Sequence, residues 1–207
     1  MGILHYDNEQ TGLLSERDEK LGAFIEKKGF VKRHVFDDFF TGLCYNIVGQ
    51  QLSMKACETI WNKFTCHIGE ILPVNCLSAD IIKQCGLSRS KAECIAECAQ
   101  RVISGELSED RLLTMSDEDV IAALIRIKGI GRWTAEMVLI FCLARPDVLS
   151  LSDFGIRKGL SLLHNIDISD KKSMERFREL YSPCGTVASV YLWEAARDLD
   201  IKGETKC

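Results

Sequence analysis

A short stretch with two glycines contains the residue types that most clearly suggest chemistry. Residues 127–135 read IKGIGRWTA, and helical patterns of apolar residues precede and follow them. Glycine adopts backbone angles that other residues avoid, so this stretch can make a tight turn. Ile130, between the glycines, can fill the space between the two helices. We therefore predict a hairpin that connects two helices and leads directly into the second one.

The chemistry expected of this hairpin is anion binding. The N–H groups at a helix N-terminus lie at the positive end of the helix dipole, which suits a DNA phosphate. Arg126, Lys128 and Arg132 add three positive charges around the turn. The alternative is a plain helix–helix turn with solvated charges, which a lone pair of glycines fits more often. The complete pattern, with tryptophan, threonine and alanine after the second glycine, is more specific.

Asp153 is the second residue of chemical interest. It lies 22 residues after Gly131, within the stretch SLSDFGIRKGL at 150–160. Taken alone, it predicts a helix N-cap, because its carboxylate can accept hydrogen bonds from the N–H groups of the first turn. A cap position also fixes the direction of the side chain, so capping is compatible with catalysis.

The whole chain sets the class of protein. Its 207 residues are 46% hydrophobic and 27% charged, as expected of a soluble globular protein with a substantial core. The net charge of −4 counts mildly against a nucleic-acid partner, so the hairpin must supply positive charge locally. We expect no membrane span, because no apolar run is long enough. The N-terminus lacks the features of a secretory signal, so we expect the protein to stay in the compartment where it is made.

The ten cysteines form no compact disulfide framework. We expect them to be reduced, and most to act as small apolar residues on helix faces. Cys94 and Cys98 lie one helical turn apart, but no second pair or histidine completes a metal site, which favours core packing. We exclude a C-terminal iron–sulfur cluster because it needs four closely spaced cysteines. Beyond Cys142 the chain has only Cys184 and Cys207.

The rest of the sequence predicts an all-α fold. Apolar residues recur at helical spacing, with serine or aspartate at the start of many segments and glycine after several of them. The only strand candidate, 148–151, is very short. The predicted helices cover 15–28, 37 or 38 to 48, 53–64, 78–86, 88 or 90 to 103, 116–127, 132–143, 153–163, 171–181 and 187–200.

Together with two further stretches, the hairpin and Asp153 resemble a known family. Residues 47–53 (IVGQQLS) look like the segment of that family that enters the minor groove. The residues YSP at 181–183, VA at 187–188 and YLW at 191–193 resemble its final helix. The chain is similar in this way to the helix-hairpin-helix DNA glycosylase superfamily, and within it to the AlkA-like 3-methyladenine DNA glycosylases of type II.

The resemblance implies a fold of two helical lobes with a cleft between them. Lobe one would cover approximately 38–150, including the hairpin at 117–143. Lobe two would combine approximately 1–37 with 151–207. The first motif lies too close to the start of the sequence for the extra N-terminal β-domain of longer relatives.

The resemblance also implies a monofunctional DNA glycosylase of base excision repair. Such an enzyme hydrolyses the N-glycosidic bond of alkylated purines, 3-methyladenine and 7-methylguanine, after the base has flipped out of duplex DNA. Asp153 would be its catalytic carboxylate, opposing the positive charge that builds on the deoxyribose. Relatives with lyase activity have a lysine immediately before the threonine–alanine pair. Trp133 stands there in this chain, so water should release the base and leave an abasic site.

The DNA contacts and the base pocket follow from the same resemblance. Gln51 or Leu52 would fill the gap left by the flipped base, with Gln50 beside it. Alternatively, Gln50 and Gln51 merely cap the turn after Gly49. The hairpin contacts would come from Lys128, Gly129, Ile130, Gly131, Arg132 and Thr134.

The base pocket is assigned to aromatic residues. Trp133 and Trp193 would stack on the base, whose positive charge is attracted to an indole face by up to about 2 kcal/mol. Ordinary core packing is the alternative for both, and for Trp193 the two interpretations are evenly balanced. Phe154 and Tyr191 are further candidates. Met137 and the stretch 184–186 depart from the family pattern, which leaves the substrate range open.

The resemblance also predicts a bound cation and a DNA partner. The carbonyl oxygens of Ile125, Ile127 and Gly129 would bind Na⁺ or K⁺ at the hairpin, and no other cofactor is required. The partner is double-stranded DNA with damaged bases, and we expect a monomer. The protein would be cytoplasmic, at the nucleoid, in a bacterium and nuclear in a eukaryote.

Three other functions are also compatible with the sequence. The first is a glycosylase for oxidised or deaminated bases. The second is a non-catalytic helix-hairpin-helix module that only binds DNA. The third is a helical protein–protein scaffold.

Overall fold

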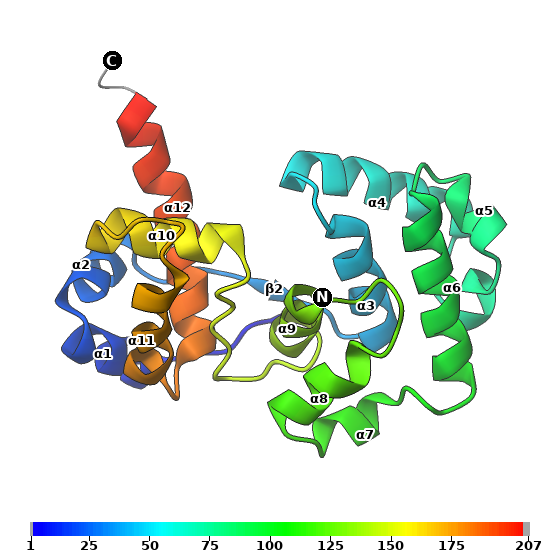
Figure 1. Ribbon diagram of the computed structural model, residues 1–207, viewed down its shortest axis with the longest axis horizontal. Helices are drawn as coiled ribbons and strands as arrows, with labels where there is room; N and C mark the ends of the chain where they lie inside the picture. Colours follow the sequence, from blue (N-terminus) through cyan, green and yellow to red (C-terminus); the bar gives the residue numbers. More distant parts are fainter. Residues whose placement is uncertain (1, 205–207) are drawn as a thin grey trace. The chain divides into compact units, whose positions relative to one another are not determined.

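The computed structural model describes residues 2–204, with side chains as far as Asp198. This part of the chain contains twelve α-helices, one short 3-10 helix and two very short strands, so the all-α prediction is confirmed (Figure 1). The chain divides into two compact units. We call Gly2 together with residues 35–144 the hairpin unit, and residues 3–34 together with 145–204 the aspartate unit. The family resemblance led us to expect lobe boundaries near 38 and 150.

The helices of the hairpin unit begin where the sequence places capping residues. Asp38 caps α3, and the hydroxyls of Ser53, Ser78, Ser88 and Ser116 cap α4, α5, α6 and α8 by accepting from N–H groups of the first turn. Helix α3 packs against α4, α6 and α9. The elements are α3 (Phe39–Gly49), α4 (Met54–Ile68), the 3-10 helix η1 (Pro73–Cys76), α5 (Ala79–Lys83), α6 (Arg89–Ile103), α7 (Glu109–Leu113), α8 (Asp117–Leu124) and α9 (Arg132–Phe141).

The aspartate unit is organised by the close packing of α10 on α12. A Cβ on Gly159 of α10 would lie only 2.2 Å from the carbonyl oxygen of Leu192 on α12, so this approach requires glycine. The packing brings the N-terminus of α10 beside the middle of α12. The helices are α1 (Asn8–Arg17), α2 (Glu19–Lys28), α10 (Phe154–His164), α11 (Lys171–Tyr181) and α12 (Gly185–Glu204). The strands β1 (Gly2–Ile3) and β2 (His34–Val35) pair with each other, and the boundary between the two units falls within each of them.

The structure corrects the predicted helix at 15–28. Asp7 starts α1 with a capping box, and Ser15 lies inside that helix, where its hydroxyl donates to the Thr11 carbonyl. Asp18 ends α1 in an extended conformation and caps α2 through the N–H groups of Lys20 and Leu21. Two helices therefore replace the single helix predicted at 15–28, and Ser15 does not begin either of them.

The strand candidate at 148–151 is also wrong. The Val148 N–H donates to the hydroxyl of Thr186, and the Val148 carbonyl accepts from Ser189. Side chains of α12 thus occupy backbone groups that a strand would offer to a neighbouring strand. The short helix α7 was not predicted at all.

The cysteines in the described part of the chain are all free thiols. Only Cys66 among them is exposed. Cys207 lies outside the described residues. No group of three or more His, Cys, Asp or Glu side chains within residues 2–204 is arranged to hold a metal ion. No described helix is long and apolar enough to cross a membrane.

Candidate functional site

The hairpin between α8 and α9 has the predicted turn, with one difference. Gly129 has a φ of +97°, and a Cβ there would lie 3.2 Å from the side chain of Cys94. Ile130 is buried, as predicted. Gly131 is extended, with a φ of −99° that any residue adopts, and it forms the N-cap of α9. Only Gly129 therefore needs the conformational freedom of glycine.

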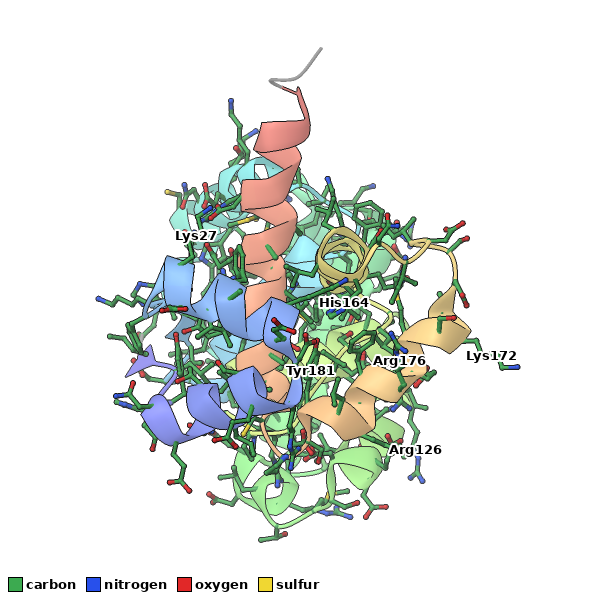
Figure 2. The ribbon with its side chains drawn as sticks, turned by 90° about the vertical axis from the view of Figure 1, so that its left-hand side faces the viewer. Lys27, Arg126, His164, Lys172, Arg176 and Tyr181 are labelled. Atoms are coloured by element: carbon green, nitrogen blue, oxygen red, sulfur yellow. The ribbon has the colours of Figure 1, made fainter. Side chains whose placement is uncertain are left out.

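The N-terminus of α9 is left open. No side chain of the described residues caps it, because Gly131 occupies the cap position. The first N–H groups of a helix have no partner within the helix, so this end can receive an anion. Lys128 is exposed beside it, and Arg126 is exposed at the surface on the same turn (Figure 2).

Arg132 is engaged by acidic side chains of its own unit. Its Nη2 lies 2.6 Å from Glu118 Oε1, and its Nε lies 3.0 Å from Glu136 Oε1. The hydrogen bond that Arg132 donates to the Glu118 carboxylate raises the pKa of Arg132. Because both bonds neutralise its charge locally, Arg132 is a weaker phosphate ligand than the sequence suggested.

The turn after α3 contacts the hairpin through Gln50. Its Nε2 donates to the Gly129 carbonyl and to the Thr134 hydroxyl, both at 2.9 Å. Gln51 is exposed and has a φ of +56°, which is unusual for a residue other than glycine. Leu52 is also exposed. The side chain of Gln50 thus supports the hairpin, while the side chains of Gln51 and Leu52 are exposed to solvent.

Asp153 occupies the N-cap of α10, which confirms the capping prediction. Its Oδ1 accepts the Ile156 N–H at 2.9 Å and the indole N–H of Trp193, also at 2.9 Å. A Cβ on Gly155 would lie 2.8 Å from Trp193 Cδ1, so glycine is needed for the indole to reach the carboxylate. Two directed donors therefore fix one oxygen of this half-buried carboxylate.

Trp193 also contacts a cation. The guanidinium carbon of Arg33 lies 5.3 Å from the indole ring centroid, and Glu194 Oε1 lies 3.6 Å from Arg33 Nη2. Burial lowers the pKa of Arg33 despite the Glu194 carboxylate. The indole–cation contact that we expected from an alkylated base is therefore made by Arg33. Together with the bond to Asp153, this favours a positioning role for Trp193.

Arg157 braces the loop that precedes Asp153. Its Nη1 donates to the carbonyls of Leu151 at 3.0 Å and Ser152 at 3.2 Å. Sequence reasoning missed this residue and also Arg33. The position of Arg157 in the first turn of α10, four residues after Asp153, was the only local indication that it could contact the preceding loop. Arg33 had none, because it lies far from Asp153 in the sequence.

The remaining pocket candidates differ in exposure. Phe154 is 61% exposed, and Trp133 is partly exposed on α9. Tyr191 is buried, and its hydroxyl lies 3.1 Å from the Gly29 carbonyl and 3.3 Å from the Tyr6 hydroxyl. Burial raises the pKa of Tyr191. Tyr191 thus lies in the core of the aspartate unit, which does not suit a base pocket.

A buried polar cluster supports the far end of α10. The Asp18 carboxylate lies 3.1 Å from His164 Nε2 and accepts from the Tyr181 hydroxyl at 2.6 Å. Burial opposes the ionisation of Asp18, but the bonds to His164 and Tyr181 outweigh it and lower the pKa of Asp18 to about 2. Figure 2 labels His164 at the end of α10 and Tyr181 at the end of α11. The cluster therefore joins α2, α10 and α11.

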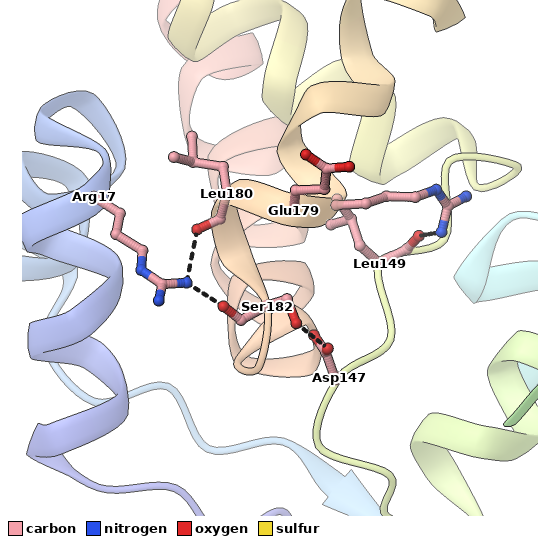
Figure 3. A pocket seen from close by; sticks show the side chains of 7 residues that line it. Arg17, Asp147, Leu149, Glu179, Leu180 and Ser182 are labelled. Carbon is pink, nitrogen blue, oxygen red and sulfur yellow. Dashed lines mark hydrogen bonds between the residues drawn. The ribbon is translucent and has the colours of Figure 1, made fainter. Parts of the chain in front are cut away.

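A separate pocket of about 680 Å³ lies elsewhere in the aspartate unit (Figure 3). Arg17 donates to the carbonyls of Leu180 and Ser182, and the Ser182 hydroxyl lies 2.5 Å from an oxygen of Asp147. Its polar groups thus bond largely to one another. Asp153 and Trp193 are not among the residues that line it.

Comparison with known proteins identifies the family. Residues 44–183 match the model of the HhH-GPD superfamily, base excision DNA repair proteins. The chain belongs to this superfamily. The resemblance inferred from the sequence is thereby confirmed.

Individual relatives agree with this assignment. The chain is 34% identical over 187 residues to DNA-3-methyladenine glycosylase 1 of Schizosaccharomyces pombe, covering 87% of this chain and 80% of the relative. A crystal structure of a DNA-3-methyladenine glycosidase from Bacillus halodurans matches with a TM-score of 0.82 and 34% identity, covering 98% of this chain and 95% of that chain. An S. pombe 3-methyladenine DNA glycosylase in complex with abasic DNA matches with a TM-score of 0.84 and 30% identity, covering 92% of this chain and 97% of that chain.

Proposed function

We propose that this HhH-GPD protein is a monofunctional glycosylase that hydrolyses 3-methyladenine and 7-methylguanine from double-stranded DNA. The observation that carries the proposal is the Asp153 carboxylate, which is fixed at the N-terminus of α10 by a backbone N–H and an indole N–H. The names of the relatives support the choice of substrate, and the abasic DNA in one of the complexes has the structure of the expected product.

The proposed catalytic step uses the negative charge of Asp153. As the bond between C1′ and the base nitrogen breaks, its electron pair leaves with the base and positive charge develops on the sugar. A carboxylate about 4 Å from that charge contributes roughly 4 kcal/mol at an effective dielectric of 20, which is about three decades in rate. The departing cationic purine becomes neutral, and water adds at C1′ to leave a hydroxyl there while its proton passes to the solvent. The donors from Ile156 and Trp193 hold the carboxylate in place, so little reorganisation is needed.

We propose that the enzyme has no lyase activity. Trp133 occupies the position where relatives with lyase activity have lysine, and an indole cannot form a Schiff base. The strand with the abasic site should therefore stay intact until it is treated with alkali or with a second enzyme.

DNA binding is assigned to the hairpin unit. The open N-terminus of α9 would bind a phosphate, with Lys128 as the supporting cation. Gln51 and Leu52 are exposed and directed outward, which supports one of them as the residue that fills the gap in the duplex. Trp133 and Phe154 remain proposed base contacts, because Trp133 is partly exposed and Phe154 is 61% exposed. We further propose a monomer, which light scattering would test.

A monovalent cation at the hairpin is also a proposal. The Gly129 carbonyl accepts from Gln50, and the Ile127 carbonyl accepts from the Ile130 N–H at 3.0 Å. Each carbonyl oxygen has a second lone pair, so these oxygens and that of Ile125 are the ligands we propose for a hard cation such as Na⁺ or K⁺. DNA affinity at constant ionic strength should fall when both ions are replaced by a large organic cation.

The experiment that tests the function identifies the released base. A panel of duplexes with 3-methyladenine, 7-methylguanine, 8-oxoguanine or uracil is incubated with the protein, and free bases are measured by mass spectrometry. We expect the two alkylated purines to be released, and strand breaks to appear only after alkali. Release of 8-oxoguanine or uracil alone would assign the chain to oxidised or deaminated bases instead. Duplex binding without any release would make it a binding module.

A further inference from the structure

Lys91 on α6 is directed at the backbone of the turn after α3. Its Nζ donates to the Val48 carbonyl at 2.9 Å and to the Gln50 carbonyl at 2.7 Å. The last carbonyls of a helix have no partner within the helix, and a cation there also complements the negative end of the dipole. Lys91 therefore closes the C-terminal end of α3.

The partial burial of Lys91 makes its two hydrogen bonds to backbone carbonyls important. Its side chain is partly buried, and this burial lowers its pKa. Removing an ammonium group from water is unfavourable unless hydrogen bonds compensate for it. The carbonyls of Val48 and Gln50 provide that compensation. The same geometry argues against a phosphate ligand or a Schiff-base amine, because the Nζ faces protein backbone.

The Gln50 carbonyl is the more informative of the two contacts. It belongs to the peptide group that precedes Gln51, the residue with a φ of +56°. Fixing this peptide group fixes the start of the left-handed conformation that turns Gln51 and Leu52 outward. The side chain of Gln50 is meanwhile held on the hairpin by Gly129 and Thr134. Backbone and side chain of one residue are thus anchored to two different elements.

We propose that Lys91 is a positioning residue that holds the turn of Gln51 and Leu52 in the shape that enters the duplex. It acts on extrusion of the base rather than on cleavage of the glycosidic bond. The inference rests on the proposed function, because it assigns Lys91 to the base-flipping step of that reaction. It adds a residue from α6 that contacts neither the base nor the sugar.

The test compares Lys91→Met with the wild type on two substrates under single-turnover conditions. One substrate has 7-methylguanine paired with cytosine, and the other has the same base in a single-nucleotide bulge, where no pair must open. We expect Lys91→Met to slow release from the paired site about tenfold, because a smaller fraction of complexes holds the base extruded. Release from the bulge should stay within about twofold of the wild type.

The variants separate positioning from general loss of structure. Lys91→Arg can still donate to the carbonyls and should restore most of the paired-site rate, and Lys91→Gln should fall between Arg and Met. Lys83→Met on α5, an exposed lysine, is the matched control and should leave both rates unchanged. If Lys91→Met fails to fold, the Gln and Arg variants carry the same comparison. Equal slowing on both substrates, or no slowing on either, overturns the proposal.

A fluorescence measurement distinguishes failure of this inference from failure of the proposed function. 2-Aminopurine beside the modified base brightens when that base leaves the stack, whether or not the bond is cut. If the wild type releases no base, the proposed function fails, and the fluorescence still shows whether Lys91→Met reduces extrusion. If the wild type releases base and Lys91→Met extrudes it equally well, only the role of Lys91 fails.

Discussion

Replacing Trp193 by phenylalanine would show whether this residue positions the carboxylate or recognises the base. The change keeps an aromatic ring but removes the N–H that lies 2.9 Å from Asp153 Oδ1. A hydrogen bond to a charged group contributes about 1.5–3 kcal/mol. The Ile156 N–H remains at 2.9 Å, so the carboxylate keeps one of its two described donors. Full loss of the indole bond in the transition state would lower the rate by about 10- to 150-fold.

The assay measures single-turnover base release and, separately, the DNA dissociation constant. We expect the rate of Trp193→Phe to fall within that range while duplex affinity changes less than about threefold, because the lost bond orients a reacting group. Trp61→Phe is the matched control. Trp61 packs between Tyr45 and Phe64, with centroids at 5.2 Å and 5.6 Å, in the hairpin unit. It should leave the rate unchanged.

A second substrate separates the two roles of Trp193. If the indole positions Asp153, the variant should lose the same factor on cationic 7-methylguanine as on any neutral base that the wild type also releases. If it instead recognises the charge of the base, the loss should be larger for 7-methylguanine. A rate for Trp193→Phe equal to that of the wild type would refute the positioning argument.

Three further predictions concern the hairpin and the buried cluster. Gly129→Ala should destabilise the protein by about 1–3 kcal/mol in urea, because alanine is strained at φ +97° and its Cβ would press on Cys94. Lys128→Ala should weaken duplex binding and reduce the salt slope by about 1, measured by anisotropy from low to high salt. The pKa of Asp18 is lowered to about 2 from an ordinary value of 3.8. The ionised Asp18 carboxylate therefore makes its full contribution to the free energy of unfolding above about pH 4. As pH falls from about 4 to 2, about 2 kcal/mol of the unfolding free energy should be lost in the wild type and much less in Asp18→Asn.

Each of these predictions has a result that contradicts it. Gly131→Ala is the control for Gly129, because no described atom lies within 4 Å of its Cβ and its φ is ordinary. Equal loss of stability in both variants would reject the strain argument. An unchanged salt slope in Lys128→Ala would remove that lysine from the phosphate contacts. Parallel acid unfolding of the wild type and Asp18→Asn would show that Asp18 does not control the transition.

The helices and the hairpin were largely predictable because their signals are local. A serine followed by an apolar pattern was enough to place the starts of α4, α5 and α8, and it limited the start of α6 to Ser88 or Ser90, of which Ser88 is the cap. Asp153 was predictable as an N-cap for the same reason. The hairpin was predictable from its glycines and the buried Ile130, although only Gly129 has a positive φ.

The two wrong predictions of secondary structure, the single helix at 15–28 and the strand at 148–151, are explained by contacts between residues far apart in the sequence. Asp18 interrupts an otherwise helical stretch, and the partners that make it suitable there, His164 and Tyr181, are far away in the sequence. The strand expected at 148–151 is prevented by hydroxyl groups of α12.

The supporting residues of the site were missed for a similar reason. Arg33 and Lys91 act through contacts with residues more than one element away. Each is an arginine or lysine that sequence reasoning would place in solvent. Their roles depend on which backbone or ring the fold brings to them, and no local pattern encodes that.

The charge of Asp153 is the central claim, and Asp153→Asn tests it most directly. Asparagine keeps the shape and the capping oxygen, so the fold and duplex binding should persist. Asp170→Asn is the matched control, because Asp170 caps α11 through the Ser173 N–H at 3.0 Å. In single-turnover release of 7-methylguanine, we predict a loss of about three decades for Asp153→Asn and none for Asp170→Asn. Release at the wild-type rate by Asp153→Asn would contradict the account.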